Sequence, residues 1–595
     1  MNSRNTWLWM VVAAGLLAFI FFHQRRARMP AVGPPRVLPE LRAAAVASVQ
    51  VRPGAQRAIQ AVRTNGGWQI TEPLVFPAQA ASIESLLGAL ERLTPVTCIS
   101  AQELKNRPGA EEEYGFATPQ ATIILRQPGY HALVQLGAPT APGDQVFLQV
   151  VGSGVYVVDA ELLRYIPRTT DDWRDTTLLD IKSLAFDHLA VTNGAKIVEL
   201  RRDDTNSPWR LVYPLAARAD SARIENALER LQGARIQQFV ADGAKTDLEP
   251  FGLQPPDLEV AFAQGTNLVA LLQFGKSLTN DTRLVYARRL SMNTIVAVAN
   301  DLLAAWRDKV NDFRDPHLVT LTAPVAAIAV RAEESFSVER QTNNAWRVLP
   351  QNFPADDEFV QDVLGALSSL KAVQFIDAVI EPDLPNYGLA PPARRYTLRS
   401  AGTNAPAGAT NAIIADVGFG TNQAGKVFAR RQDESFVYGI ATNDYQRLPG
   451  ASWQFRDRRI WNISTNDLDR AIIRQQGKVR QLKRNGPHSW SLITQGIIND
   501  LAVEETVRGL CQLTASVWVA RGEQNRARYG FTEKGHQITL ELKNGDKLTV
   551  EFGAAAPSGF PYAAVTLDGT LWIFEFPLAL YQDVASYLTI PADVP

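Results

Sequence analysis

Four tryptophans open the same succession of segments along this 595-residue chain, and this repetition constrains its fold more than any other feature. Trp68, Trp209, Trp346 and Trp490 are separated by 141, 137 and 144 residues. A nearly constant long period indicates one structural unit copied in tandem. Because each copy of about 140 residues has the size of an ordinary domain, we expect each copy to bury a core largely of its own.

Short segments of alternating apolar and polar residues surround each tryptophan. In the first copy they are residues 48–51 and 61–63, and in the third they are residues 326–330 and 336–339. Alternation broken by a few polar residues predicts a β-hairpin, with the tryptophan beginning the next strand. Three of these tryptophan strands end near a proline, and the fourth does not.

A helix is predicted after each tryptophan strand, because apolar residues recur there at helical spacing on one side only. The predicted helices cover residues 82–93, 221–232, 357–371 and 501–513. Three short polar residues precede three of these helices and are expected to cap them: Asp220, Asp356 and Asn499. Since a one-sided helix is not stable alone, we expect each to pack against an antiparallel or mixed sheet, which gives an α+β fold.

Two further glycine-containing elements return in every copy. An aromatic-Gly-apolar triplet follows each helix and begins at Tyr114, Phe251, Tyr387 and Tyr529. Glycine suits a turn with a positive φ at this place. Later strands end in an apolar-Gly pair, and residues 418–423 belong to this series. They begin like a dinucleotide-binding loop but lack its last glycine, so we interpret them as a turn.

An aromatic-Arg-Asp element closes the first three copies and is absent from the fourth. Its residues are Trp173, Arg174 and Asp175, then Phe313, Arg314 and Asp315, then Phe455, Arg456 and Asp457. Because the last copy dispenses with it, we interpret it as a junction between successive repeats. We expect the arginines to hold the junction through hydrogen bonds and the aspartates to cap or pair nearby. The alternative is a ligand-binding charge pair.

Residues 7–22 form an uninterrupted apolar run that ends at His23 and several arginines. Sixteen residues are slightly fewer than the roughly 17 to 25 of a typical membrane-spanning helix. The run is longer than the apolar region of a typical signal peptide, and no small-residue cleavage site follows it. We therefore predict an uncleaved membrane anchor in residues 1–28 that inserts into the lipid bilayer through residues 7–22. The prolines of residues 29–43 predict a stiff spacer after it.

The predicted organisation is an α+β chain of four tandem repeats behind one N-terminal transmembrane helix. The repeats are assigned to residues 44–183, 184–323, 324–465 and 466–595. Three arginines directly after the apolar run, Arg25, Arg26 and Arg28, favour a cytoplasmic location for the repeats, by the positive-inside rule. Long domains are nevertheless translocated against such charges.

The order of tryptophan strand, helix, Tyr-Gly-Leu turn and aromatic-Arg-Asp junction behind a membrane segment resembles the bacterial family catalogued as domain of unknown function 4340. The resemblance covers nearly everything after residue 44. It implies a membrane-anchored protein associated with an ABC-transporter permease and an auxiliary protein of the gliding-motility type. It also implies a single-pass protein of the inner membrane whose bulk is periplasmic. The family has no established activity, so the resemblance supplies no catalytic residue.

Composition and motifs argue against several chemistries. With 60 basic and 61 acidic residues the formal charge is −1, which gives no electrostatic case for nucleic acid. No pair among the six histidines has metalloprotease spacing. The run Glu111–Glu113 is interpreted as a solvated segment. Cys98 and Cys511 occupy unmatched positions, which excludes a repeated disulfide or zinc framework. We therefore predict no catalytic residue, no cofactor and no metal site.

Two classes of function remain open. The first is a membrane-tethered extracytoplasmic scaffold or interaction protein that belongs to an ABC-transporter-type envelope complex, because tandem repeats create binding surface readily. The second is an exported carbohydrate-binding protein or hydrolase with a cleft between repeats. That alternative requires a polar cluster present in one copy and absent from the others, which the sequence does not reveal. The four tryptophans could stack on sugars, but at the head of apolar strands we expect them in the core.

Overall fold

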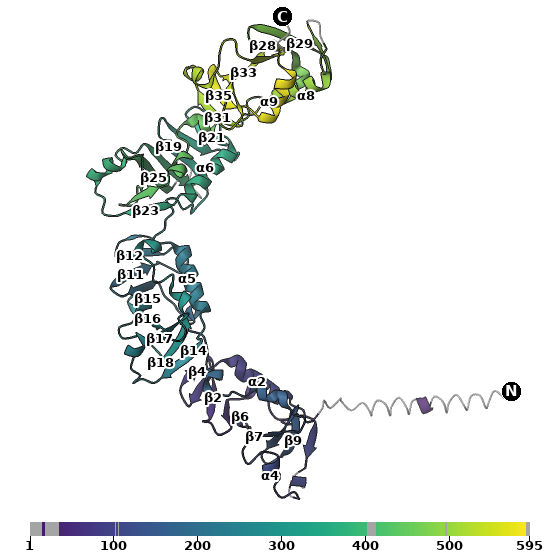
Figure 1. Ribbon diagram of the computed structural model, residues 1–595, viewed down its shortest axis with the longest axis vertical. Coiled ribbons are helices and arrows are strands. Elements are labelled where there is room, and N and C mark those ends of the chain that lie inside the picture. Colours follow the sequence, from purple (N-terminus) through teal and green to yellow (C-terminus); the bar gives the residue numbers. More distant parts are fainter. Residues whose placement is uncertain are drawn as a thin grey trace, which may run out of the picture. The chain divides into compact units, whose positions relative to one another are not determined.

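The computed structural model describes residues 15–17, 35–100, 103–104, 106–400, 412–493 and 497–590. Four antiparallel sheets follow one another along the chain, so the coarse expectation of tandem units built from sheets and a few helices is met. The chain divides into two compact units. The first contains residues 1–214 and 222–308, and the second contains residues 215–221 and 309–595. Figure 1 labels the helices and strands of both units.

The strands of the first half of the chain form the first two sheets. They are β1 (Ser48–Pro53), β2 (Ile59–Thr64), β3 (Gly67–Glu72), β4 (Phe76–Pro77), β5 (Thr97–Ile99), β6 (Ala121–Gln127), β7 (Tyr130–Pro139), β8 (Gln145–Val150) and β9 (Gly154–Asp159), then β10 (His188–Asn193), β11 (Lys196–Arg201), β12 (Arg210–Tyr213), β13 (Ala217–Arg218), β14 (Gln238–Asp242), β15 (Leu258–Gln264), β16 (Asn267–Ser277), β17 (Leu284–Arg289) and β18 (Thr294–Ala299).

The third and fourth sheets contain the remaining strands. They are β19 (Val325–Arg331), β20 (Ser335–Arg340), β21 (Trp346–Leu349), β22 (Phe353–Pro354), β23 (Ala372–Ile376), β24 (Arg394–Ser400), β25 (Ile413–Thr421), β26 (Val427–Arg431) and β27 (Val437–Ile440), then β28 (Leu468–Gln475), β29 (Lys478–Gly486), β30 (Ser489–Leu492), β31 (Val517–Arg521), β32 (Gln537–Leu542), β33 (Lys547–Ala555), β34 (Pro561–Leu567) and β35 (Thr570–Glu575).

The first sheet shows the topology that the others share. Its strand order is β4-β3-β2-β1-β6-β7-β8-β9-β5, so two antiparallel meanders meet where β1 pairs with β6. The main helix α2 (Ala80–Arg92) lies in the chain between β4 and β5, the two edges of the sheet. A helix that connects opposite edges must cross the sheet, and it therefore covers one face.

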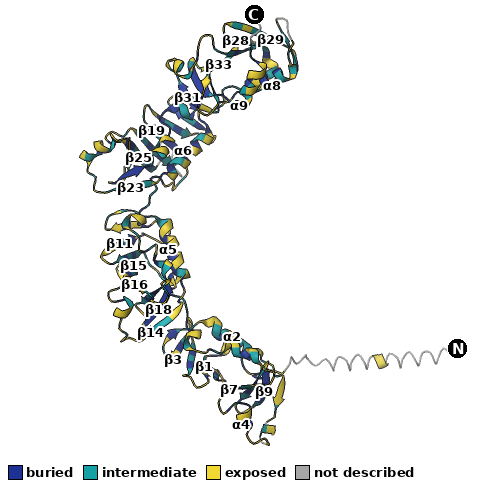
Figure 2. Cartoon of the chain, in the orientation of Figure 1, coloured by how far each residue is buried: buried dark blue, intermediate teal, exposed yellow. Residues whose placement is uncertain are grey.

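Each sheet has one such helix in the same place, and Figure 1 shows α5 and α6 lying along their sheets. The helices are α2, α5 (Ser221–Gly233), α6 (Asp357–Ser369) and α8 (Asp500–Cys511). Their apolar stripes are buried and their outer sides are exposed (Figure 2). In the third repeat the buried stripe is Val360, Val363, Leu364 and Leu367, whereas Phe359 and Ala366, which also lie at helical spacing in the sequence, are only partly buried.

Side-chain caps begin helices α6 and α8 as the sequence predicted. Asp356 accepts hydrogen bonds from the backbone N–H groups of Glu358 and Phe359, and Asn499 accepts one from Ala502. These bonds satisfy amides that have no partner within the helix. Helix α2 begins after Gln79, whose side chain makes no capping bond. The apolar stripe on the sheet, present in all four helices, is therefore the stronger determinant of where a helix forms.

Paired glycines fix the backbone on the sheet face opposite the helix. Gly388 of the third aromatic-Gly-apolar triplet has a φ of +68°. A Cβ built on Gly420 would lie only 2.0 Å from the carbonyl oxygen of Gly388, so a side chain would clash there. The first triplet repeats this approach, with the Cβ position of Gly137 lying 2.0 Å from the oxygen of Tyr114. The interpretation of residues 418–423 as a turn is wrong for the part containing Gly418 and Gly420. Both lie inside β25, where glycine allows the loop backbone to pack directly on the strand.

The fourth sheet ends differently from the others. In the part of the chain that the structure describes, which omits residues 494–496, its strand order begins at β30, and helix α9 (Leu578–Tyr587) comes after its last strand. Leu580 of α9 lies against Gly509 of α8, and Tyr581 packs on the same core. Where the first three repeats continue into an aromatic-Arg-Asp element, the last one places a second helix against its first.

The expected spacer is not extended over its second half. Val37, Leu38 and Leu41 are buried in the core of the first unit, and the Val37 N–H donates to the Leu93 carbonyl at the end of α2. Prolines suggested a stiff linker, but apolar residues between them pack on the helix instead. The predicted anchor at residues 7–22 lies outside the described residues except for 15–17. No helix among the described residues is long and apolar enough to cross a membrane.

Candidate functional site: the arginine junctions

The four repeated tryptophans lie in the cores of their repeats. Between 1% and 5% of each residue is exposed, so they are structural and are not available to stack on a ligand. In the first repeat the Trp68 indole N–H donates to Glu84 at 2.8 Å, and the Arg63 guanidinium lies over the ring at 4.6 Å while pairing with the same carboxylate. This arginine-tryptophan-carboxylate cluster joins a hairpin to the helix on its sheet.

The first junction centres on Arg174, of which 1% is exposed. Its guanidinium lies between the rings of Phe76 and Phe239, at 4.2 and 3.9 Å from their centroids. It donates two hydrogen bonds to Asp242, at 2.7 and 3.0 Å, and one to Thr294 at 3.2 Å. Phe76 belongs to the first sheet, whereas the other three partners belong to the second. The guanidinium therefore ties two successive sheets of the first compact unit together.

The second junction places Arg314 in an equivalent position within the second compact unit. Its guanidinium lies 4.2 Å from the centroid of Phe375 and 4.4 Å from that of Phe436, and it donates to Asp377 at 2.7 Å. Of Arg314, 2% is exposed. Its Nη2 atom is buried without a hydrogen-bond partner. Phe375 belongs to β23 of the third sheet and Phe436 comes just before β27, so the segment that carries Arg314 is anchored on the third repeat.

The third junction is looser. Arg456 lies 4.4 Å from the Trp572 ring centroid and 5.5 Å from that of Phe353, but its nearest carboxylate oxygen, on Asp568, is 3.7 Å away. Asp568 is 90% exposed. Burial lowers the pKa of Arg456, and the distant Asp568 only partly offsets this effect. Stacking on Trp572 contributes more here than the ion pair does.

The aspartates of the three elements turn the chain after each arginine. Asp175, Asp315 and Asp457 accept hydrogen bonds from the backbone N–H groups two residues later, each at 2.9 Å. The backbone of each aspartate also bonds to the short edge strand of its repeat, as from Asp175 to Pro77. These contacts give the aspartates a local, turn-forming role.

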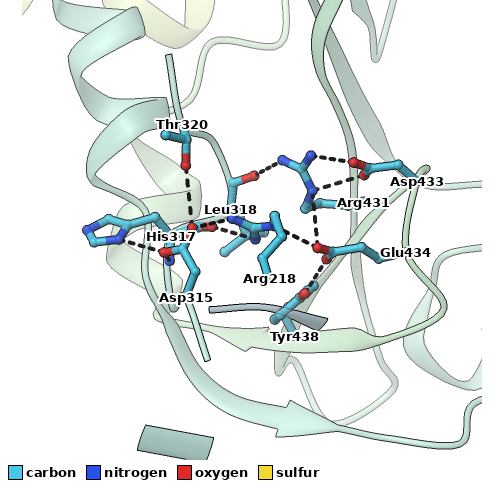
Figure 3. Close-up of polar contacts among 9 residues, drawn as sticks. All are labelled: Arg218, Asp315, His317, Leu318, Thr320, Arg431, Asp433, Glu434 and Tyr438. Carbon is cyan, nitrogen blue, oxygen red and sulfur yellow. Dashed lines mark hydrogen bonds and ion pairs between the residues drawn. The ribbon is translucent and has the colours of Figure 1, made fainter. Parts of the chain in front are cut away.

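A buried polar network distinguishes the second junction (Figure 3). Here Ala217 and Arg218 stand where the first and third repeats have Phe-Pro. Arg218 donates to Glu434 at 2.7 Å and to the His317 carbonyl at 2.7 Å, and it also pairs with Asp315. Ala217 thus takes the place of the aromatic residue of the short strand, and Arg218, an arginine with three acceptors, takes the place of the proline.

The far side of this network is built on β26 and the turn after it. Arg431, of which 6% is exposed, donates to Asp433 at 2.6 and 2.9 Å and to the Leu318 carbonyl at 2.5 Å. Tyr438 donates its hydroxyl proton to Glu434. Glu434 therefore connects the two halves, because it faces Arg218, Arg431 and Tyr438 together (Figure 3).

The electrostatics of this network keep its groups in the protonation states that pair with one another. Burial alone would lower the pKa of Arg218, but Glu434 and Asp315 raise it above its usual value. Burial alone would raise the pKa of Asp433, but hydrogen bonds from Arg431 hold it below its usual value. Burial and the neighbouring Glu434 raise the pKa of Tyr438 far above its usual value. All these groups keep their paired states near neutral pH, so none is poised as an acid or base.

His317 and Asp315 resemble part of a hydrolase triad, since the imidazole Nδ1 lies 3.0 Å from an Asp315 oxygen. The carboxylate is also held by Arg218 and by the Thr320 hydroxyl. Within the part of the chain that the structure describes, no serine, threonine or cysteine is bonded to the other imidazole nitrogen. The pair completes the network and lacks a nucleophile.

The structure also places the remaining predicted landmarks. The aromatic residue of each aromatic-Gly-apolar triplet packs against an aromatic ring on a strand of its own sheet. The pairs are Tyr114 with Phe147, Phe251 with Tyr286, Tyr387 with Phe428, and Tyr529 with Tyr562. No cluster of metal-binding side chains occurs in the described residues. Cys98 is exposed and Cys511 is buried, and burial raises the pKa of the Cys511 thiol to about 12.

Sequence reasoning placed the three arginines at junctions but did not find their acceptors. Arg174 and Asp242 are 68 residues apart, and Arg218 and Glu434 are 216 residues apart. A usable signal was present for the tryptophan clusters, since glutamate comes directly after the first buried helix residue in three of the four helices, at Glu84, Glu225 and Glu504.

Comparison with known proteins identifies the family. The model of a domain of unknown function, DUF4340, matches residues 68–208, 209–349 and 346–497. Each match begins at or close to one of the repeated tryptophans. Searches of curated proteins and of solved structures returned no match. Since the three matches cover well over half of its length, the chain belongs to the DUF4340 family and carries the domain in tandem, which confirms the resemblance seen in the sequence.

Proposed function

We propose that this tandem DUF4340 protein is a membrane-tethered, extracytoplasmic scaffold that holds together components of an ABC-transporter-type envelope complex. One observation carries the proposal: successive repeats are joined through buried arginines. Arg174 bridges two sheets of the first unit, and the Arg314 and Arg218 contacts hold the connecting segments on the third sheet. Within the first unit, such a fixed junction lets two successive repeats present a shared surface to a partner.

The location is proposed from the N-terminus. The apolar run at residues 7–22 would anchor the chain in the inner membrane as a single pass, with the bulk in the periplasm. Protease added to intact spheroplasts is expected to digest the repeats. If the repeats are instead digested only after the membrane is opened, the bulk of the chain is cytoplasmic and the export proposal fails.

Affinity capture tests the partnership. Full-length protein crosslinked in cells and purified from solubilised membranes is expected to bring with it a permease subunit and an auxiliary subunit in fixed proportion. The comparison variant is Arg174→Ala, which should lose partners that span the first junction while remaining in the membrane. Recovery of the protein alone after crosslinking would contradict the scaffold.

A cleft-based function is the second candidate, and one cavity favours it. A cavity of about 490 Å³ in the first unit is lined by Gln69 and Phe76 of the first sheet and by Asp242, Asn293 and Thr294 of the second. Polar groups in this lining suit the hydroxyl groups of a sugar, whereas the Phe76 ring is buried against Arg174. Screening purified protein against cell-envelope glycans tests this function, and binding abolished by Asn293→Ala would support it over the scaffold alone.

A further inference from the structure

The third repeat lacks one charge that the other three share. In each of the four sheet-crossing helices we compare the residue that follows the first buried one. In repeats one to four, the first buried residues are Ile83, Ile224, Val360 and Val503, and the residues that follow them are Glu84, Glu225, Gln361 and Glu504, respectively. A neutral amide thus occupies, in the third repeat, the position of a carboxylate. The tryptophan and the arginine of the cluster are both retained there, as Trp346 and Arg340.

The complete clusters show what that carboxylate does. In the fourth repeat, Glu504 accepts from the Arg484 guanidinium at 2.8 Å and from the Trp490 indole N–H at 2.7 Å. Burial alone would raise the pKa of Glu504, but these hydrogen bonds hold it below its usual value. In the second repeat, Glu225 lies 3.2 Å from Arg202 and 2.7 Å from the Trp209 indole nitrogen. One carboxylate satisfies both donors in each case.

In the third repeat both donors lack a partner among the described residues. Arg340 lies opposite Trp346 in the β20-β21 pair, as Arg484 lies opposite Trp490 in β29-β30. Among the residues that the structure describes, neither the Arg340 guanidinium nor the Trp346 indole N–H has a hydrogen-bond or ion-pair partner. Arg340 is exposed, and although only 5% of Trp346 as a whole is exposed, its indole nitrogen is not among the fully buried atoms without a partner. Two nearby carboxylates are engaged elsewhere: Asp357 accepts from the Trp346 backbone N–H, and Glu339 from the Ser337 hydroxyl.

A cavity of about 730 Å³ opens at this position. Arg340, Trp346 and Gln361 line it together with apolar residues from the segment before β19 and from α6, including Leu321, Pro324 and Leu364. Among the described residues that line this cavity, Arg340 is the one that carries a charge. The corresponding cavity of the second repeat, about 550 Å³, contains Glu225 and Glu229 beside Arg202. The site in the third repeat is therefore cationic, whereas its counterpart already holds its own carboxylates.

We propose that the third repeat binds a carboxylate supplied by another molecule, in the place where the other repeats use their own glutamate. Arg340 would pair with the carboxylate and Trp346 would donate its indole hydrogen bond, as in the complete clusters. Leu321, Pro324 and Leu364 would receive an aliphatic group next to it. The proposal extends the scaffold function by naming what a partner presents, but the site itself does not depend on that function.

Calorimetric titration of the purified full-length protein tests the site with four probes. They are the peptide acetyl-Gly-Gly-Leu-Leu with a free C-terminus, the same peptide as its C-terminal amide, an amidated peptide with one internal glutamate, and hexanoate. At least one carboxylate should bind and the amide should not. Preference for the free C-terminus, for the glutamate side chain or for hexanoate identifies the source of the carboxylate.

Two substitutions decide whether the binding occurs here. Gln361→Glu restores the internal carboxylate, so it should weaken binding by at least about tenfold and raise the melting temperature. Arg340→Gln should weaken binding similarly. As a matched control, Gln361→Ala should bind as the native protein does. Failure of every carboxylate to bind, or equal binding by Gln361→Glu, would overturn the proposal. If the protein binds a carboxylate as expected but brings no partner with it in affinity capture from membranes, only the scaffold proposal is refuted.

Discussion

The first and second junctions both bury the arginine of an aromatic-Arg-Asp element, but in different surroundings. At the first, Arg174 lies between Phe76 and Phe239, and the short edge strand contributes an aromatic ring. At the second, that strand contributes Arg218, whose charge is balanced by Asp315 and Glu434. The comparison teaches that the buried arginine of the aromatic-Arg-Asp element is the shared requirement. Its surroundings can be aromatic or ionic, provided that every buried charge keeps a partner.

Removing the shared arginine should have the largest effect at both junctions. Arg174→Ala and Arg314→Ala are each expected to destabilise their compact unit by about 3 kcal/mol. This is the lower end of the roughly 3 to 5 kcal/mol for breaking a buried pair, because their aspartate partners are about 40% exposed. Hydrogen exchange followed by mass spectrometry resolves the two units separately. If backbone amides in the unit without the substitution also lost protection from exchange, the two junctions could not be treated as independent.

Glu434→Gln should weaken only the second junction, by about 2 to 3 kcal/mol, because it removes the charge that faces Arg218 and Arg431. Chemical denaturation monitored in both units measures the effect. Asp433→Asn is the matched control, because Asp433 is 61% exposed and its loss should cost less. Equal costs for the two variants would mean that burial does not govern the network.

Tyr438→Phe should cost about 1 to 2 kcal/mol at neutral pH, because it leaves an oxygen of Glu434 without a donor. It should also change the alkaline behaviour. The folded state raises the pKa of Tyr438, so its contribution is complete below about pH 10, the usual value, and is lost as pH rises toward the higher folded pKa. Unfolding curves between pH 8 and 11 should therefore fall less steeply in the variant. An unchanged slope would contradict this assignment.

Arg456→Ala should have the smallest effect, about 0.5 to 1 kcal/mol, because its carboxylate partner is exposed and 3.7 Å away. Thermal unfolding monitored by fluorescence of the nearby Trp572 measures it. A cost as large as that of Arg174→Ala would show that aromatic stacking, and not the ion pair, stabilises all three junctions.

Periodic features of the fold were predictable from the sequence. Apolar spacing located all four main helices to within a few residues, and the repeated tryptophans marked buried strand positions, because these features depend on local pattern and burial. The junction role of Arg174 was inferred from the absence of its element in the last copy. Its acceptor Asp242 could not be derived, because contacts between residues far apart in the chain depend on how two sheets pack.

Three departures have separate physical causes. Gly420 suggests a turn in the sequence because glycine favours turns, but here it allows close backbone packing inside a strand. Residues 37–41 suggest a spacer because prolines lie before and among them, but their apolar side chains are buried in the core of the first repeat. Gln361 conveys nothing until the structure places it opposite Arg340, because a surface glutamine on a helix has no pattern of its own.

The three family matches begin at Trp68, Trp209 and Trp346, and the first ends just before Trp209, so the period of the family cuts through the sheets and not between them. Deleting residues 68–208 would join β2 directly to the segment that begins with Trp209, at the place where Trp68 stood. Strands β1 and β2 would then complete a hybrid sheet with the later strands of the second copy. Recombination within such a gene could change the number of copies without leaving half a sheet behind.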